Sequence, residues 1–465
     1  MPSSSIPTTK HVPIPLFLFT YNCNQQDLIP EVFKSKLVSI LPDQLSSLYV
    51  FGFQEFCSVL DGLFASSASA KLINFNQMLQ SALQEKYHQP TGFSTISSTF
   101  IGAIGMIIIT PYAAKFKNVR TATTSCGYAY SSLKGGVGAR VSYYPEGALD
   151  SSDHVELSFA TAHLNAYEGE YYYLQRNTNL YNIIRSLNFG DGYGLIKPEN
   201  HVFILGDLNY RTSQNYTPND AESQELLSLL DVSATDAAYS KRVEELVDKY
   251  DELKMSMQNG DVLQNFSEGK ITFPPTYKFH LNTAIYNTKR SPSWCDRVVY
   301  LSSYEEVGPN TLGQQFPKLT SSSKANHDEI VRQSLPEVKE YNSLDSLLMS
   351  DHRPIYLEIS VPFSPPQSII SPLSGCMQIL PAGLKAGVLL NETSRLEALE
   401  RSSNVVSGPT TLYLKPTTYD NITQNVIRPL SNTIIGYGIW LGGTRQGRLF
   451  LLTLIFIVWV YFRFF

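Results

Sequence analysis

The sequence predicts a mixed α/β domain over about residues 10–361, followed by a polar segment and an apolar C-terminal helix. Three observations lead to this prediction. Short apolar runs recur along the first three quarters of the chain, helix-patterned segments lie between some of them, and the last residues are almost wholly apolar. Short apolar runs bounded by turn formers are typical of buried strands, and strands interspersed with helices indicate layers of sheet and helix.

Seven runs are predicted to be strands because each is short, apolar and rich in β-branched or aromatic residues. They are Leu16–Phe19, Leu48–Phe53, Ile104–Thr110, Leu157–Ala162, Val202–Leu205, Val298–Leu301 and Ile355–Ile359. Apolar spacing and composition predict helices over Asn74–Lys86, Tyr172–Ser186 and Glu222–Tyr250. The polar stretch Tyr304–Asn342 is predicted to be a surface loop.

The composition changes after Ile359, so we expect a linker over residues 362–433. It begins with a stretch rich in proline and serine. The pattern over Lys385–Glu400 fits one short amphipathic helix, weakened by Gly387, and the polar residues from Ser402 to Leu430 resemble a tether.

Residues 434–465 are predicted to form a C-terminal membrane anchor. Leu449–Phe462 is apolar except for Thr453, and a helix from Leu449 to Phe465 would be about 25 Å long, near the thickness of a thin bilayer. A buried core helix is the alternative, but the run is apolar all round and ends the chain. Arg445 and Arg448 precede it, which by the positive-inside rule places the bulk of the protein in the cytosol. The modest length favours the endoplasmic reticulum.

Charge and cysteine content agree with a cytosolic protein that does not bind nucleic acid. The chain has 36 Lys and Arg against 41 Asp and Glu, a net charge of −5, whereas phosphate-backbone binding draws on many cations. The five cysteines form no C-x-x-C pair and no zinc-like cluster, which suits a reducing compartment. The N-terminus shows no signal peptide.

Polar residues cluster at the ends of the predicted strands. Six such motifs are Thr20-Tyr21-Asn22, Gln54-Glu55, Thr161–Asn165, Gly206–Asn209, Trp294–Arg297 and Ser350–Pro354. Each alone is explained by the preference of Asn and Asp for turns. Together they supply carboxylates, amides and imidazoles suited to a hard divalent cation and an acid/base pair. We therefore expect a catalytic site at one edge of a sheet.

The ordered motifs TYN, GFQE, KGGV, AHLNA, RN, GDLNYR, FPPTYKF, SPSWCDR and SDHRP resemble the inositol polyphosphate 5-phosphatases of the endonuclease/exonuclease/phosphatase superfamily. The resemblance covers about residues 14–360, and FPPTYKF, PSWCDR and GDLNYR are its most specific blocks. It implies a four-layer α/β sandwich, in which two mixed β-sheets are flanked by helices and the site lies at one rim. With the C-terminal anchor, the chain is most similar to fungal tail-anchored phosphatidylinositol 4,5-bisphosphate 5-phosphatases.

The resemblance implies roles for the residues at the strand ends. Asn22 and Glu55 would hold one Mg²⁺ through oxygen ligands, the usual coordination of this ion. Asp207, helped by Asn209, would position and deprotonate the attacking water.

Four further residues would act around the scissile phosphate. His352, oriented and kept charged by Asp296, would donate hydrogen bonds to it. His163 would contact the same phosphate, and Asp351 would support the metal site or bind a second metal.

Recognition of an inositol headgroup requires cations for the phosphates that are not cleaved. The positions that match the family, or lie near its contacts, are Tyr277, Lys278, Arg290, Lys289, Lys134, Arg176, Asn177 and Arg297. Two departures from the family pattern affect this set. Leu133 replaces the usual Asn before KGG, and Lys289 stands one position nearer to the Pro-x-Trp block than the family's lysine.

These residues predict Mg²⁺-dependent hydrolysis of the 5-phosphate of phosphatidylinositol 4,5-bisphosphate to give the 4-phosphate, without a covalent phosphoenzyme. A lipid substrate is favoured because an anchor would confine the domain to a membrane surface. The alternatives are a sphingomyelinase or nuclease of the same superfamily, and an inactive tether that binds phosphoinositides. Activity on soluble inositol phosphates or on the 3,4,5-trisphosphate lipid, and protein partners, stay open.

Overall fold

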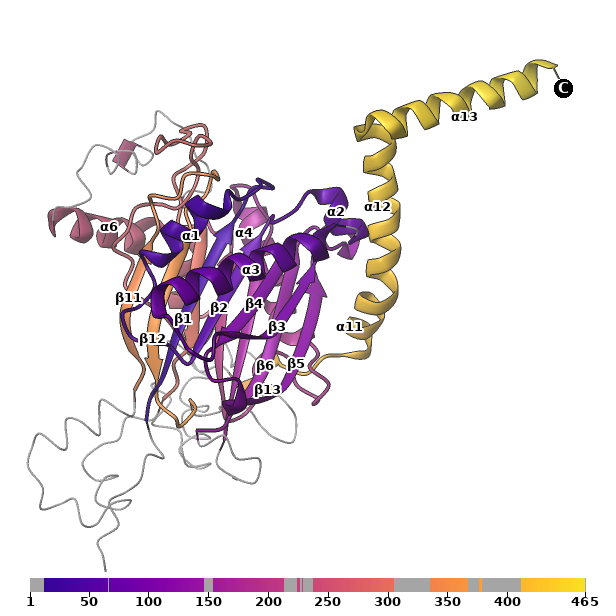
Figure 1. Ribbon diagram of the computed structural model, residues 1–465. Coiled ribbons are helices and arrows are strands. Elements are labelled where there is room, and N and C mark those ends of the chain that lie inside the picture. The colour runs from indigo at the N-terminus through magenta and orange to yellow at the C-terminus, as the bar shows by residue number, and fades with distance from the viewer. Residues whose placement is uncertain are drawn as a thin grey trace, which may run out of the picture.

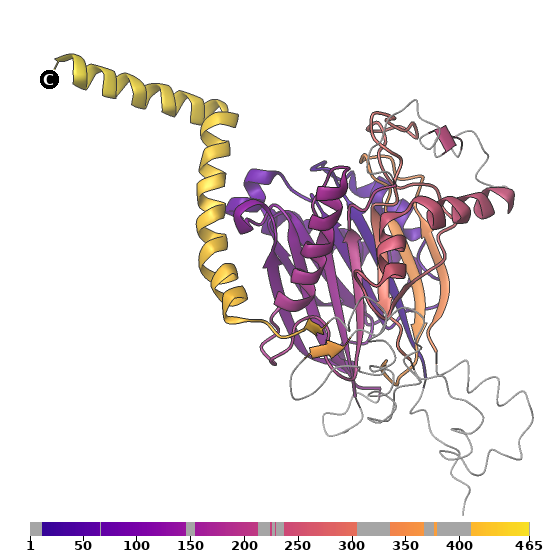
Figure 2. The ribbon, with the colours of Figure 1, turned by 180° about the vertical axis from the view of Figure 1, so that it is seen from behind.

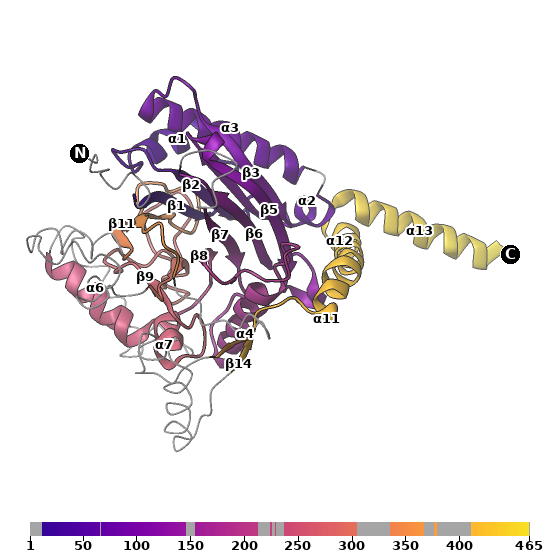
Figure 3. The same ribbon diagram turned by 90° about the horizontal axis from the view of Figure 1, so that it is seen from below.

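The first three quarters of the chain fold into two mixed sheets, packed face to face and covered by helices on both outer sides (Figures 1 and 3). A computed structural model describes residues 12–65, 67–145, 154–212, 224–225, 228, 237–304, 335–366, 376–378 and 411–464. The expected four-layer α/β sandwich is confirmed.

The first sheet has six strands in the order β11-β12-β1-β2-β4-β3, and β1 and β2 run parallel. The strands are β1 (Ile14–Asn22), β2 (Leu48–Gln54), β3 (Ser94–Ile101), β4 (Ile104–Thr110), β11 (Glu337–Ser343) and β12 (Ile355–Val361). Helices α1 (Pro30–Val38) and α3 (Ala68–Tyr87) cover its outer face, where their apolar side chains pack against phenylalanines of β1 and β2. The short helix α2 (Val59–Phe64) follows β2.

The second sheet also has six strands, in the order β5-β6-β7-β8-β10-β9, with β7 and β8 parallel. They are β5 (Phe116–Ser125), β6 (Gly135–Tyr143), β7 (Val155–His163), β8 (Asn200–Asp207), β9 (Phe266–Glu268) and β10 (Asp296–Leu301). Its outer face is covered by α4 (Glu170–Ser186) and α7 (Glu252–Asn259), and α6 (Ala237–Tyr250) packs against the core between the sheets.

Apolar side chains from both inner faces form the central core, whose burial supplies the main driving force for folding. Gly52 of β2 allows the two sheets to approach each other closely, because a Cβ there would lie 2.5 Å from Oγ1 of Thr161 on β7. Next to it the amide of Gln54 donates hydrogen bonds to Thr161 Oγ1 at 2.9 Å and to Thr20 Oγ1 at 3.0 Å. These contacts fix the two sheets relative to each other just below the strand ends.

All seven predicted strands are present, and α3 and α4 match two predicted helices. The predicted helix Glu222–Tyr250 is present as α6 over Ala237–Tyr250, and most of its earlier part lies outside the described residues. Strands β3, β5 and β6 escaped prediction. Exposed polar residues interrupt the apolar pattern of β3 and β5, and glycines, Arg140 and Ser142 interrupt that of β6. The predicted loop Tyr304–Asn342 is wrong at its end, since Glu337–Ser343 pairs with β12 as a largely polar edge strand.

The segment after the sandwich returns to its surface. We define residues 414–443 as the C-terminal strap, made of α11 (Thr418–Ile422), a π-helical turn (Thr423–Ile427) and α12 (Arg428–Gly443). It follows a two-stranded pairing of β13 (Cys376–Gln378) with β14 (Thr411–Tyr413). Figures 1 and 2 show the strap, in yellow, running along one flank of the sandwich. The expected tether over Ser402–Leu430 is therefore wrong from residue 411 onward, and the expected helix Lys385–Glu400 lies outside the described residues.

The final helix, α13 (Arg445–Phe464), leaves the strap and points away from the sandwich (Figures 1 and 2). Among the described residues it is the one helix long and apolar enough to cross a membrane. Nearly all its side chains are exposed, and Gly447 is buried against the carbonyl of Trp440. The predicted apolar C-terminal helix is confirmed.

Candidate active site

Strand register brings three of the predicted residues into a row at one rim of the second sheet. The parallel strands β7 and β8 end opposite each other at His163 and Asp207. On the other side of β8, the antiparallel strand β10 begins with Asp296 opposite Asp207. Asp207 therefore lies between an imidazole and a second carboxylate, and it is almost completely buried.

The first sheet contributes residues to the same point. Asn22, the last residue of β1, donates from Nδ2 to Oδ2 of Asp207 at 2.8 Å. Glu55 directly follows β2, and its Oε1 lies 3.8 Å from Nε2 of His163. The same His163 nitrogen is 3.3 Å from Oδ2 of Asp207. The site thus lies where the C-terminal ends of two parallel strand pairs meet.

His352 faces this group from the loop before β12. Its Nδ1 is 2.8 Å from Oδ2 of Asp296, and its Nε2 is 3.8 Å from Oδ2 of Asp207. Thr276 donates a further hydrogen bond to Oδ2 of Asp296 at 2.7 Å. A histidine held at Nδ1 by a carboxylate has a fixed ring orientation, so Nε2 is presented to the centre of the site.

The carboxylates around His352 change its protonation. Burial opposes a positive charge, but Asp296 and Asp207 outweigh it and raise the pKa of His352 to about 9. Burial also opposes the charge of Asp207, yet His352 and His163 hold the pKa of this carboxyl well below its usual range. The pKa of Asp296 is raised, chiefly by burial. At neutral pH the centre therefore holds an imidazolium beside an ionised Asp207.

The pKa of His163 is shifted in the opposite direction. Burial, followed by the charge of Lys134, lowers the pKa of His163 below its ordinary value of 6.5. Burial likewise lowers the pKa of Lys134, whose Nζ makes a short contact with Nε2 of His163. This contact holds Lys134 at the rim of the site.

Unusual backbone conformations position Asp207 and the residues after it. Gly206 has φ of 140°, and a Cβ there would lie 2.0 Å from the carbonyl oxygen of Ala162, which leaves room only for glycine. Asn209 has φ of 56° and donates from its backbone N to Oδ1 of Asp207 at 3.0 Å. Glu55 also has a positive φ, of 48°. Such conformations concentrate at functional sites, where the surrounding structure holds them.

The donor set fits a hard divalent cation. Asp207 and Asp296 each place a carboxylate oxygen within 4.8 Å of the other, whereas the protonated His352 beside them has no lone pair to offer a metal ion. Glu55, about one third exposed, offers a carboxylate at the open side of the group, and Oδ1 of Asp296 is buried without a hydrogen-bond partner among the described residues. Carboxylate and amide oxygens are the ligands that Mg²⁺ and Ca²⁺ prefer.

Cations and an aromatic ring surround the opening. The ring of Tyr277 lies over His352, with centroids 4.6 Å apart. Lys278 Nζ is 2.9 Å from Oδ2 of Asp351, and Arg290 Nη1 is 3.0 Å from Oε2 of Glu168. Both cations are partly exposed and both pair with a single carboxylate, an arrangement that an incoming phosphate can displace.

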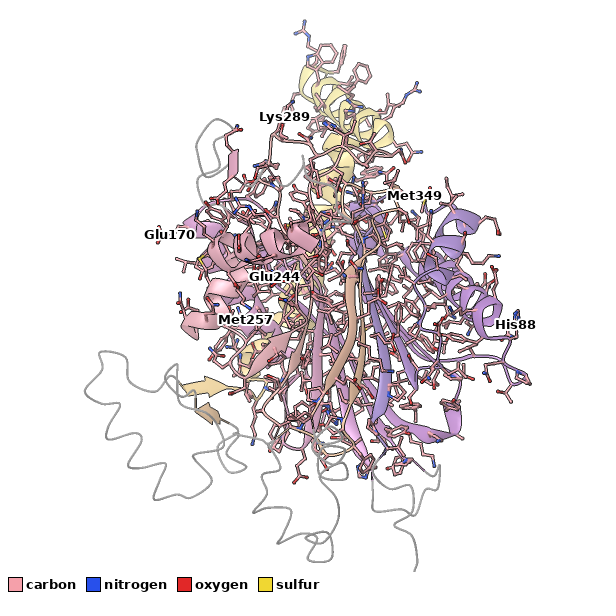
Figure 4. All side chains as sticks on the ribbon, turned by 90° about the vertical axis from the view of Figure 1, so that its left-hand side faces the viewer. His88, Glu170, Glu244, Met257, Lys289 and Met349 are labelled. Carbon is pink, nitrogen blue, oxygen red and sulfur yellow. The ribbon has the colours of Figure 1, made fainter. Side chains whose placement is uncertain are left out.

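The remaining predicted cations differ in their surroundings. Lys289 is exposed at the same end of the domain as Met349, which directly precedes the SDH motif (Figure 4). Asn177 accepts a hydrogen bond from Tyr210 at 2.6 Å and contacts Ser256. Arg176 is fully buried and pairs with Glu252 at 2.6 Å. Arg176 and Asn177 therefore serve the packing of α4 against α7.

The prediction that Arg297 binds substrate is wrong. It is fully buried, donates to both oxygens of Asp251 at 2.8 and 2.9 Å, and pairs with Glu268. Its side chain points away from Asp296 because successive residues of a strand face opposite sides of the sheet. The pair Asp296-Arg297 thus sends one residue to the site and the other to a structural ion pair.

Sequence reasoning missed three side chains that shape the site. Glu168 carries no distinctive signal, since single Glu residues are common on loops, whereas Thr276 lies within the FPPTYKF block and could have been found there. Arg211, within the GDLNYR block, could have been found from its position. It donates to the side chain of Asn209, and its guanidinium lies 4.5 Å from the ring centroid of Tyr277.

Comparison with known proteins agrees with this geometry. The family described as Endonuclease/Exonuclease/phosphatase family 2 matches residues 19–358, nearly three quarters of the chain. The chain belongs to this family. It is 27% identical over 356 residues to inositol-1,4,5-trisphosphate 5-phosphatase 1 of Schizosaccharomyces pombe. The aligned region covers 75% of this chain and 27% of that protein. It is also 27% identical over 282 residues to mouse phosphatidylinositol 4,5-bisphosphate 5-phosphatase A, covering 59% of this chain and 24% of that protein.

A solved structure shows the same architecture. The inositol polyphosphate 5-phosphatase domain of spSynaptojanin, crystallised with inositol (1,4)-bisphosphate and calcium ion, matches with a TM-score of 0.56 and 26% identity. The match covers 76% of this chain and 85% of that one. The resemblance to inositol polyphosphate 5-phosphatases is confirmed, although the chain spans only about a quarter of the length of the two curated relatives named above.

The Arg297 network gives the first prediction. Arg297→Leu leaves Asp251 and Glu268 as buried carboxylates without their cation, so the free energy of unfolding should fall by about 3–5 kcal/mol. Urea denaturation measures this loss. If the residue has no contact with substrate, KM of the folded fraction should equal that of the wild type, and a raised KM would contradict the structural role.

Proposed function

We propose that this protein is a divalent-cation-dependent phosphoinositide 5-phosphatase that converts phosphatidylinositol 4,5-bisphosphate to phosphatidylinositol 4-phosphate. The observation that carries the proposal is the arrangement around Asp207. Asn22 and His163 contact this ionised carboxylate, and the His352–Asp296 pair faces it. The named activities of the relatives support the choice of a phosphorylated inositol as substrate.

Asp207 would position the attacking water and accept its proton, since it is ionised and faces the centre. The water oxygen bonds to the phosphorus of the 5-phosphate while the bond from phosphorus to the inositol oxygen breaks. The leaving oxygen takes up a proton and inorganic phosphate is released. The protonated His352 would donate from Nε2 to a phosphoryl oxygen, because its Nδ1 is engaged by Asp296.

Glu55 and Asn22 would hold the cation at the open side of the group, with Asp207 and Asp296 nearby. A bound Mg²⁺ supplies neutralisation of charge on the phosphoryl oxygens. Asn22 contributes independently of the ion, because its amide N–H orients the carboxylate of Asp207.

Lys278 and Arg290 would bind the neighbouring 4-phosphate. Each is partly exposed beside the site and pairs with one carboxylate, Asp351 or Glu168. A doubly charged phosphate offers more acceptors than one carboxylate, so it can compete for these cations. Lys134 at the rim would add a further positive charge near the scissile group.

We further propose that α13 anchors the protein in a thin membrane, such as that of the endoplasmic reticulum, with the catalytic domain on the cytosolic side. The exposed apolar helix and the arginines just before the apolar run support this proposal. An anchored domain meets a lipid substrate at a high local concentration.

The first test replaces the central residues. Asp207→Ala or His352→Ala should lower phosphate release from phosphatidylinositol 4,5-bisphosphate by roughly 10²–10⁴-fold, because each removes an acid/base group. Thermal melting checks that the variants stay folded, and Asp43→Ala, at a fully exposed aspartate, is the matched control.

The same assay identifies the reaction class. Chelator should abolish release and added Mg²⁺ should restore it. A panel with soluble inositol phosphates, the 3,4,5-trisphosphate lipid, sphingomyelin and DNA separates the superfamily activities. Turnover unaffected by chelator, or wild-type turnover in either variant, would disprove the mechanism.

A second test uses pH. If the protonated His352 donates to the phosphate, kcat should decline as pH rises through about 9, where this histidine loses its proton. Asp296→Asn removes the strongest upward contribution to the pKa of His352, so the decline should begin at lower pH. Profiles of kcat for both proteins between about pH 6 and pH 10 measure the shift. Superimposable alkaline limbs would exclude this role for the pair.

A third test concerns the anchor. Deletion of residues 449–465 should move the protein from the membrane to the soluble fraction, since the apolar length needed to span a bilayer is lost. Cell fractionation measures the distribution. Continued sedimentation of the shortened chain with membranes, resistant to high salt, would show that α13 is not the anchor.

A further inference from the structure

The C-terminal strap turns polar side chains toward the sandwich and apolar side chains toward solvent, the reverse of the usual arrangement of a surface helix. A surface helix of a globular protein normally turns its apolar face toward the core and its polar face toward solvent. The strap residues facing the sandwich include Asp420, Gln424 and Asn432, whereas Ile422, Val426, Leu430 and Ile434 are 49–64% exposed. These exposed residues are spaced four apart, and we name them the outer stripe.

The inner face is fixed to the sandwich by directed polar bonds. Asp420 accepts two hydrogen bonds from Arg185, at 2.8 and 3.1 Å. Oε1 of Gln424 accepts from the backbone N of Ser125 at 2.9 Å, and Nε2 donates to the Ser125 carbonyl at 3.3 Å. Further along, Oδ1 of Asn432 accepts from the backbone N of Ser132 at 2.8 Å. These bonds fix which side of the strap faces outward.

Two features identify what covers the outer stripe. The first is direction, because α13 turns away from the sandwich at the end of α12 (Figure 2). A bilayer crossed by α13 would therefore lie along the outer side of the strap. The second is charge, because residues 421–465 contain four arginines and no Asp, Glu or Lys. Two of these arginines, Arg445 and Arg448, are exposed just before the apolar run, where anionic lipid headgroups would meet them, whereas Arg428 faces the sandwich and donates to Thr123 Oγ1 at 3.1 Å.

We propose that the outer stripe is a membrane-contact surface, on which the strap lies in the headgroup region of an anionic bilayer while α13 crosses it. The inference rests on the proposed anchor. Because the strap is bonded to residues 125–132, directly before Lys134 in the site, the domain is held on the membrane in one orientation. The partner is thus a lipid surface rather than a second copy of the chain.

The test places single fluorophores on the full-length chain. Cys126 and Cys376 are replaced by serine, which leaves Cys23, Cys57 and Cys295 as buried thiols. An environment-sensitive dye is then attached at Ile434→Cys, at Leu454→Cys within α13, or at Ile73→Cys, a matched exposed isoleucine on α3. The proteins are reconstituted in vesicles of about four parts phosphatidylcholine to one part phosphatidylserine.

The fluorescence of the dyes at residues 434 and 454 should increase by roughly threefold or more relative to the dye at residue 73. Lipids with a spin label near the headgroup should quench the dye at residue 434. If the dye at residue 454 reports insertion but the dye at residue 434 is as dim as the dye at residue 73, the outer stripe does not contact the membrane and the anchor proposal stands. If residue 454 is not inserted, the anchor and the surface both fail. A bright residue 434 that lipid spin labels do not quench would identify a second protein copy and overturn the proposal.

Discussion

The carboxylate of Asp207 is the point on which the candidate site depends. It ends β8 at the rim where both sheets meet, and it contacts Asn22 from the first sheet and His163 from the second. The buried charge is tolerated because the neighbouring imidazoles favour its ionised form. Loss of the sheet-to-sheet register would separate these groups and leave the charge unpaired, so packing of the central core and electrostatics of the site are interdependent.

The environment gives the two histidines different protonation states. His352 lies between Asp296 and Asp207, which raise its pKa, whereas burial and Lys134 lower the pKa of His163. His352 can therefore donate to a phosphate, whereas His163 contacts Lys134 and Asp207. Neighbouring groups whose pKa values are driven apart in this way are a common means of assigning acid and base roles within one site.

The C-terminal segment changes how the domain and the apolar helix are related. A free tether would let the sandwich rotate relative to a membrane. The strap instead bonds through Gln424 and Asn432 to the segment that precedes Lys134. The orientation of the site relative to α13 is therefore set by polar contacts within the chain.

Local patterns were enough to predict seven of the strands and most of the residues at their ends, because apolar runs and the polar motifs that bound them can be recognised without tertiary contacts. The sequence could not separate Asp296 from Arg297, since strand alternation and distant partners send one to the site and the other to Asp251. Nor could it foresee the strap, whose polar inner face finds its partners only across long sequence separations. Local patterning predicted the elements, and only tertiary contacts decided which polar side chains meet.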